Sequence, residues 1–486
     1  MSLATARPAR ERLAPLVPAI AAVTSLAVYC LTLVREVDWG DGAELSLQAF
    51  QLGVTHAPGY PVHTFLGKLF GLFIPDPALA TNLLSAICTS VAVGLLAWTA
   101  LRLTGNRIAA LAAAMAFGLS PFVWEKAVVT EVYNVNGCFV ALAVALILVW
   151  FRKPSWGVLA AAAVVFGLSL GTYLANLLFL PAFMFMVLHR SPPRRWRMAA
   201  AFLLIVASVG IILLSWSYFR SRVIVPPGTL YIPNTLGGFL RYLRGAQYGT
   251  TVVQSPGFYL QRAVEHTIRF TKNLLGIGVI LGLIGFWRLW REQRGMCIGL
   301  LIMFAINFGY FTGYQAPDYA YMVTPAYLVF SLWIAGGLAY LLKQRRVAYR
   351  AIGVVAAIAL LGGLFIWKLP VRVARSRSMQ VTEFASSSFE VLPENAVVIA
   401  AWRRFAPLLY FQRTRGLRPD LTLIERHEQT RYYAHGAVSG WQNFAASLPP
   451  STPVFIDRIE TGSQSVQQVS SIGDTWHQIT VEAASK

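Results

Sequence analysis

Apolar runs of membrane-spanning length follow one another along the first three quarters of the chain. They fall at about residues 13–34, 78–101, 108–124, 127–151, 156–188, 198–219, 273–289, 296–314, 320–342 and 350–368. Each is long enough, or nearly so, to cross about 30 Å of hydrocarbon. Hydrophobic residues make up 56% of the chain and charged residues 13%, against about 25% charged residues in soluble domains. This composition predicts an integral, multi-pass membrane protein and argues against a disordered or nucleic-acid-binding chain.

Basic residues set the direction of the predicted spans. The run 156–188 is too long for one helix, and arginines and lysines flank it on both sides, at 152–153 and 190–197. Because such residues mark cytoplasmic loops, we expect this run to cross twice, with a break near Gly171 and Thr172. This predicts an all-α bundle of about eleven transmembrane helices with a cytoplasmic N-terminus. Much of the net charge of +20 then comes from the predicted cytoplasmic loops and does not indicate a surface that binds polyanions.

The composition changes after residue 369, so we divide the chain into a transmembrane domain, 1–369, and a soluble domain, 370–486. The second part is polar and carries short apolar runs of strand length, with one segment of helical pattern between the first two. The expected strands are Ala396–Ala400, Leu421–Ile424, Pro453–Ile456 and Gln478–Val481, and the expected helix is Phe405–Arg415. We expect a small α/β domain, placed outside the cytoplasm by the odd number of spans.

Carboxylates of the membrane part gather on the predicted outer side, in loops or at helix ends. They are Glu36, Asp38, Asp41, Glu44, Asp76, Glu125, Glu131, Glu265 and Asp318. Acidic groups near a bilayer are costly and often functional. The alternative is that acidic residues simply populate outer loops by default.

The first outer loop, 35–77, carries the strongest candidates. Asp41 and Glu44 are three residues apart and share a face if a helix begins there, which favours a catalytic pair. Alternatively, Asp41 is the helix N-cap and Glu44 its capping-box partner, and the two roles are compatible. His56 lies next to a Pro-Gly-Tyr-Pro bend that contains Tyr60, on a rigid stretch where a substrate-binding residue would be well held. An interfacial histidine with a structural role is the alternative for His56.

Two further outer clusters and one cationic loop complete the candidate site. Glu131 and Tyr133 lie at the outer end of the third and fourth spans, and Asp318 lies in a turn lined with tyrosines. Anchoring in the aromatic belt is the alternative for most of the tyrosines. The outer loop 220–272 includes Arg220 and Arg222, and its cations suit an anionic lipid headgroup or a lipid phosphate.

Three ordered motifs carry a family resemblance. Trp-Gly-Asp-Gly-Ala-Glu (39–44), His-Ala-Pro-Gly-Tyr-Pro (56–61) and Trp-Glu-Lys-Ala-Val-Val-Thr-Glu-Val-Tyr (124–133) together resemble the protein O-mannosyltransferase-like membrane family of GT-C glycosyltransferases. The resemblance is densest over about 35–190 and fainter at 318–327 and 418–423. It implies a polyprenyl- or dolichyl-phosphate sugar donor, an active site at the outer face and an acid in the first outer loop. The family often has a histidine near the fifth and sixth spans, where this chain reads Gly-Thr-Tyr-Leu-Ala-Asn (171–176).

The residues and the resemblance lead to one expected reaction. A sugar, mannose or another hexose, moves with inversion from a polyprenyl-phosphate donor to a hydroxyl of a protein or glycan acceptor at the outer membrane face. Asp41 is the expected general base, and Glu44 orients the acceptor or helps. The expected substrate-binding residues are His56, Tyr60, Glu131, Tyr133 and Asp318, with Arg220 or Arg222 on the departing phosphate. We expect no cofactor, although Asp38, Asp41 and Glu44 form a group able to bind Mg²⁺.

A membrane transporter or flippase for a lipid-linked or small polar substrate is the main alternative. Such a protein would place charged or broken helices near the bilayer midplane. Ionisable residues are nearly absent from the centres of the predicted spans, which argues against it. A structural or assembly protein is the third possibility.

Overall fold

The computed structural model describes residues 16–190, 194–223, 235–245, 255–314, 318–426, 442, 445–449, 451–458, 466–473 and 475–481. These residues form two compact units. The first unit takes those within 1–33, 82–214 and 250–376, and the second takes those within 34–81, 215–249 and 377–486. The division at residue 369 stays a prediction, because the second unit combines the C-terminal residues with two earlier segments.

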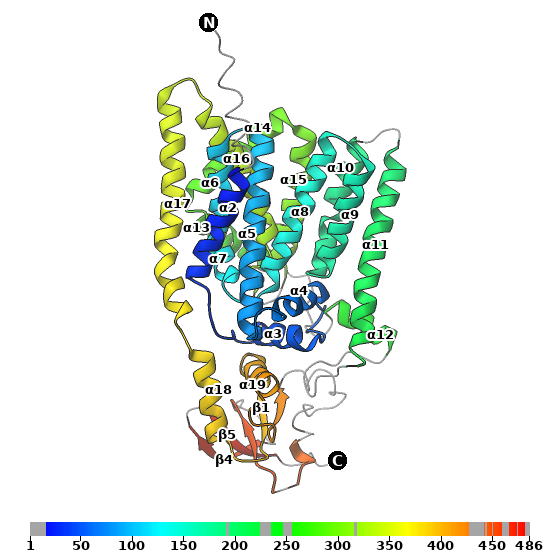
Figure 1. Ribbon diagram of the computed structural model, residues 1–486, viewed down its shortest axis with the longest axis vertical. Coiled ribbons are helices and arrows are strands. Elements are labelled where there is room, and N and C mark those ends of the chain that lie inside the picture. Colours follow the sequence, from blue (N-terminus) through cyan, green and yellow to red (C-terminus); the bar gives the residue numbers. More distant parts are fainter. Residues whose placement is uncertain are drawn as a thin grey trace. The chain divides into compact units, whose positions relative to one another are not determined.

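Apolar helices make up the first unit and stand side by side (Figure 1). In the described part of the chain, six helices are long and apolar enough to cross a membrane, or eight if each of two bent pairs counts as one span. The six are α5 (Pro77–Thr104), α8 (Val132–Arg152), α11 (Arg195–Arg220), α15 (Arg294–Thr312), α16 (Thr324–Leu342) and α17 (Val347–Ser376). The bent pairs are α6 (Arg107–Gly118) with α7 (Pro121–Ala127) and α13 (Pro256–Asn273) with α14 (Ile277–Glu292).

Three shorter apolar stretches accompany them: α2 (Leu16–Leu31), α9 (Trp156–Leu170), and η1 (Leu174–Phe179) continued by α10 (Leu180–Arg190). The predicted break in 156–188 is present, because α9 ends at Leu170 with Gly171 as its C-cap. The helical membrane bundle is thus confirmed, while the count of eleven spans stays a prediction.

Glycines bring two of these helices close together. A Cβ on Gly285 of α14 would lie 1.7 Å from the carbonyl oxygen of Trp333 on α16, and one on Gly337 would lie 2.0 Å from that of Leu281. Only glycine therefore permits this backbone contact, the packing mode that apolar helices use when lipid supplies no hydrophobic driving force.

The second unit contains a five-stranded sheet, which confirms the small C-terminal α/β domain. Its strands are β1 (Val397–Ala400), β2 (Thr422–Glu425), β3 (Val454–Ile456), β4 (Val466–Ile472) and β5 (Trp476–Val481), in the order β2-β1-β3-β5-β4. Strand β1 is parallel to β2 and β3, whereas β5 is antiparallel to β3 and β4. Helix α18 (Gln380–Val391) precedes β1, and α19 (Trp402–Arg415) connects β1 to β2.

The segment predicted as the first outer loop, 35–77, belongs to the same unit as this sheet. It forms two short helices, α3 (Asp41–Gln51) and α4 (Pro61–Gly71), and α12 (Leu236–Leu243) also lies in this unit. Ala43 and Leu47 of α3 share one hydrophobic core with Val398 of β1 and with Phe405 and Leu408 of α19. Helix α3 is therefore fixed by burial against the α/β domain.

Candidate active site

Helix α3 begins one residue earlier than a capping role for Asp41 requires. Its N-cap is Gly40, at φ 54°, no side chain caps it, and Asp41 is its first helical residue. The alternative that Asp41 and Glu44 serve only as a capping box is therefore wrong. Both carboxylates lie in the first helical turn, where the helix dipole favours negative charge, and both are available for tertiary contacts.

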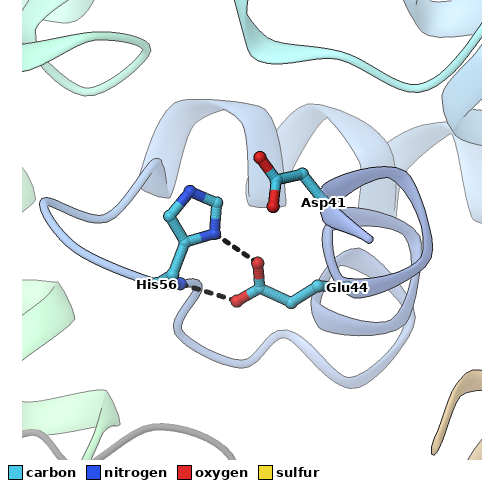
Figure 2. Close-up of side chains that lie close together, drawn as sticks. All are labelled: Asp41, Glu44 and His56. Atoms are coloured by element: carbon cyan, nitrogen blue, oxygen red, sulfur yellow. Dashed lines mark hydrogen bonds and ion pairs between the residues drawn. The ribbon is translucent and has the colours of Figure 1, made fainter. Parts of the chain in front are cut away.

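Glu44 and His56 form a pair (Figure 2). The Glu44 side chain is 3% exposed, and its Oε1 accepts a hydrogen bond of 2.6 Å from the backbone N–H of His56. Its Oε2 is hydrogen-bonded to Nδ1 of the His56 ring. The other ring nitrogen, Nε2, lies 3.4 Å from the hydroxyl of Tyr60. Glu44 therefore holds both the backbone and the imidazole of His56 in place.

Burial controls the protonation of Glu44. Desolvation raises the pKa of Glu44, and the negative charge of Asp41 raises it further. The charge of His56 and its hydrogen bonds oppose this effect, and the pKa remains above its ordinary value. Glu44 therefore takes up a proton more readily than an exposed glutamate would.

Asp41 has a partner that sequence reasoning missed. The indole N–H of Trp402, the first residue of α19, donates a 2.6 Å hydrogen bond to Oδ1 of Asp41. The Trp402 ring also stands edge-on to the His56 ring, with centroids 6.0 Å apart and an interplanar angle of 81°. Trp402 is 361 positions away from Asp41 in the chain, and no motif connects the two. Its one local signal is its position two residues after a predicted strand, where parallel-sheet domains often place functional residues.

Three of the site residues can also hold a metal ion. Ligand atoms of Asp41, Glu44 and His56 all lie within 4.8 Å of one another. The expected third carboxylate, Asp38, is outside this group and accepts a hydrogen bond from the backbone N–H of Trp39 at 2.9 Å. The observed group contains the imidazole of His56 where the predicted group has the carboxylate of Asp38. An imidazole ligand shifts the preference of a metal site from Mg²⁺ toward transition metals.

The two candidate phosphate-binding arginines differ in their contacts. Arg220 donates to the backbone carbonyls of Leu52 at 2.7 Å and Gln51 at 3.3 Å. It therefore supplies a donor to the carbonyls at the C-terminal end of α3. Arg222 is exposed, hydrogen-bonds the Tyr218 hydroxyl and lies 4.3 Å from the centroid of that ring. Of the two, Arg222 has the guanidinium that a ligand reaches with less rearrangement.

The remaining predicted residues lie in the first unit. Tyr133 donates a 2.9 Å hydrogen bond to Asp318, so the structure brings these two together. Glu131 is the N-cap of α8 and pairs with Lys126 at 2.7 Å. The prediction did not include Lys126, although it stands in the third motif.

Comparisons with known proteins agree with the motifs. The family model described as "Protein O-mannosyl-transferase TMEM260 N-terminal domain" matches residues 41–196. The chain is 25% identical to the mouse (Mus musculus) protein O-mannosyl-transferase TMEM260 over 439 residues, which cover 83% of this chain and 62% of the mouse protein. It is 33% identical to the Dictyostelium discoideum protein O-mannosyl-transferase tmem260 over 135 residues, 27% of this chain and 16% of that protein. The chain thus spans less than two thirds of the length of these relatives.

Solved structures show the same fold. ArnT from Cupriavidus metallidurans, in a crystal structure with undecaprenyl phosphate, superposes with a TM-score of 0.58 at 14% identity. The match covers 97% of this chain and 98% of that chain. The structure of the same protein in the apo state gives a TM-score of 0.57, over 95% and 97%. The fold is therefore GT-C-like, and the resemblance to the protein O-mannosyltransferase-like GT-C membrane family, predicted from the three motifs, is confirmed.

Proposed function

We propose that this chain is an inverting glycosyltransferase. It transfers mannose or another hexose from a polyprenyl-phosphate donor to a hydroxyl of a protein or glycan acceptor at the outer membrane face. The observation that carries the proposal is the Asp41 carboxylate, held by Trp402 beside the Glu44–His56 pair. The relatives named protein O-mannosyl-transferase and the undecaprenyl phosphate bound to ArnT support the reaction class and the donor.

The proposed step uses Asp41 as general base. The carboxylate accepts the proton of the acceptor hydroxyl while that oxygen forms a bond to the anomeric carbon of the sugar. The bond from this carbon to the phosphate oxygen breaks, and the phosphate leaves with the electron pair. A single displacement of this kind inverts the anomeric centre. Arg222 is our candidate for holding the departing lipid phosphate, because a guanidinium matches phosphate oxygens in bidentate geometry.

Glu44 acts through His56 in this proposal. Both Glu44 oxygens are engaged by His56, so the glutamate fixes the loop that carries His56 and Tyr60. These two side chains then face the acceptor hydroxyl or the sugar as hydrogen-bonding groups. The predicted acceptor contact of Glu44 itself would require one of its present bonds to open.

The proposed step needs no metal, because the leaving group is a phosphate and cations are available from arginine. We therefore expect extensive treatment with a chelator to leave sugar transfer unchanged. Loss of transfer on chelation, with recovery on adding Zn²⁺ or Mn²⁺, would instead assign Asp41, Glu44 and His56 as metal ligands.

The test is the Asp41→Asn variant, which keeps the size of the side chain and removes the base. In purified protein supplied with polyprenyl-phosphate mannose and a hydroxyl acceptor, we expect turnover to fall about 10²–10⁴-fold, the usual contribution of a positioned acid–base group. Donor binding should be retained. Glu383→Gln, an exposed carboxylate on α18 in the same unit, is the matched control and should be as active as wild type. A folded Asp41→Asn protein with normal transfer would contradict the mechanism.

A further inference from the structure

Trp402 brings the C-terminal α/β domain into the candidate active site. Its indole N–H is 2.6 Å from the Asp41 carboxylate, and its ring borders His56. An indole donates one hydrogen bond and accepts none. Trp402 therefore cannot take a proton from an acceptor, and it acts on Asp41 by orienting the carboxylate.

The α/β domain holds Trp402 on a rigid element. Strand β1 is buried along its length, and the N–H of Ala401, the next residue, donates to Oδ2 of Asp457 at 3.1 Å. Helix α19 begins at Trp402 and is anchored in the core by Phe405 and Leu408, which are 1% and 0% exposed. The indole is thus positioned by buried structure, as a precisely aligned site requires.

The start of helix α3 packs against the start of α19. The N–H of Gly40 donates to the carbonyl of Arg403 at 3.4 Å. Gly40 has φ +54°, and a Cβ there would point at Trp402 Cδ1 (3.5 Å) and at the Cα of Arg403 (3.8 Å). The left-handed backbone conformation of Gly40 therefore lets the N-termini of α3 and α19 meet, which sets the distance between Asp41 and Trp402.

We propose that Trp402 is a positioning residue for the transfer reaction. Its hydrogen bond fixes the orientation of the Asp41 carboxylate that accepts the proton. The C-terminal α/β domain thereby completes the active site. This inference rests on the proposed function, in which Asp41 is the base, and adds a role for a domain that the reaction scheme otherwise leaves unused.

The test compares two tryptophan substitutions in the same unit. Trp402→Phe removes the N–H donor and keeps an aromatic ring. We expect kcat to fall about 10- to 100-fold, the scale of a misplaced catalytic group, with donor KM little changed. Trp402→His, which keeps a ring N–H, should recover part of the rate.

Trp476→Phe is the matched control. Trp476 is 1% exposed in the core of the α/β domain, and its indole N–H donates to Ser388 Oγ at 3.1 Å. Losing this bond should lower stability and leave the kcat of the folded enzyme at its wild-type value. If both substitutions reduce kcat equally and Trp402→His recovers none of the rate, Trp402 is only structural and the inference is overturned.

A second measurement does not depend on activity. In protein labelled with ¹⁵N-tryptophan, the resonance absent from Trp402→Phe belongs to the Trp402 indole. We expect it to shift in Asp41→Asn and not in Glu383→Gln. An unchanged resonance would refute the contact. If the resonance responds but the wild-type protein transfers no sugar, the proposed function fails, and with it the positioning role, while the contact stands.

Discussion

Glu44 is a carboxylate that the fold removes almost entirely from water. An isolated ionised carboxylate in such a place would be costly, and buried acidic groups are rarely left without a partner. The sequence places the partner twelve residues further along the chain, where His56 follows the end of α3. Glu44 thereby fixes the loop that carries His56. The neighbouring acid, Asp41, remains partly exposed and available for chemistry.

The raised pKa of Glu44 has a consequence for stability. The folded protein binds this proton more tightly than the unfolded chain does, so stability decreases as pH rises from the ordinary glutamate value to the raised one. Above that window the contribution is constant. We expect Glu44→Gln to lose this part of the pH dependence, as measured by thermal unfolding midpoints across pH. Its transfer rate should fall less than that of Asp41→Asn, and a larger fall would exchange the roles of the two acids.

Arg220 and Arg222, both in the predicted outer loop 220–272, should have different functions. We expect Arg222→Ala to weaken donor binding, seen as a higher donor KM with kcat less affected. Arg220→Ala should instead destabilise the protein by about 1.5–3 kcal/mol, the range for hydrogen bonds to a charged group, because two carbonyls at the end of α3 lose their donor. The reverse pattern would assign phosphate binding to Arg220.

At the scale of elements, Arg418 joins α18 to β2. Its guanidinium donates to the carbonyls of Leu392 at 2.8 Å and Pro393 at 2.9 Å, and it pairs with Asp420 at 2.8 Å. The carboxylate of Asp420 also accepts a hydrogen bond of 3.1 Å from the backbone N–H of Asn395. One side chain thus connects the segment after α18 to the turn that starts β2.

This connection should weaken in acid. The hydrogen bond from Arg418 lowers the pKa of Asp420 to about 2. Because this pKa is below its unfolded value, the stabilising effect is present above the ordinary aspartate range and is lost as pH falls toward 2. We expect Asp420→Asn to lower the unfolding temperature of the α/β domain at neutral pH and to differ little from wild type near pH 2. Equal destabilisation at both pH values would contradict this origin.

The elements that sequence reasoning found are those with strong local patterns. Four strands and α19 were expected from apolar runs and lie within a few residues of the predicted positions. Strand β4, Val-Gln-Gln-Val-Ser-Ser-Ile, was missed because it is an edge strand with few apolar residues. Helix α18 was also missed, since three serines weaken its helix propensity. Its buried residues, Val381, Ala385, Ser388 and Phe389, do follow helical spacing, so a usable signal was present.

The residues of the candidate site also differ in whether a local sequence pattern predicts them. The proximity of Asp41 and Glu44 follows from helical spacing, and His56 was expected from the bend beside it. Trp402 was not expected, because its contact with Asp41 depends on how α19 packs against α3, which no local pattern encodes. The sequence thus predicts the loop that carries Asp41, Glu44 and His56. It does not predict Trp402, which tertiary packing brings to Asp41.

At the scale of the whole molecule, the distribution of charge predicts how the chain lies in the membrane. Arginines and lysines cluster in alternate connections between the apolar helices, for example at 102–107, 190–197 and 343–350. Most carboxylates of the membrane part lie in the other connections, of which 220–272 carries arginines as well. Positive residues resist translocation, so the α/β domain and the first outer loop should be on the side away from the cytoplasm, where a lipid-linked sugar donor would meet its acceptor.

Cysteine labelling tests this topology. In a variant whose four native cysteines are replaced, Ser386→Cys places a thiol on the exposed face of α18, and Arg346→Cys places one in a predicted inner connection. We expect a membrane-impermeant thiol reagent added to intact cells to label Ser386→Cys, and to label Arg346→Cys only after lysis. Retained sugar transfer would show that each variant is folded. If the labelling is reversed, the helices of 156–188 do not cross twice, because losing one of the two crossings moves every later segment to the opposite side of the membrane.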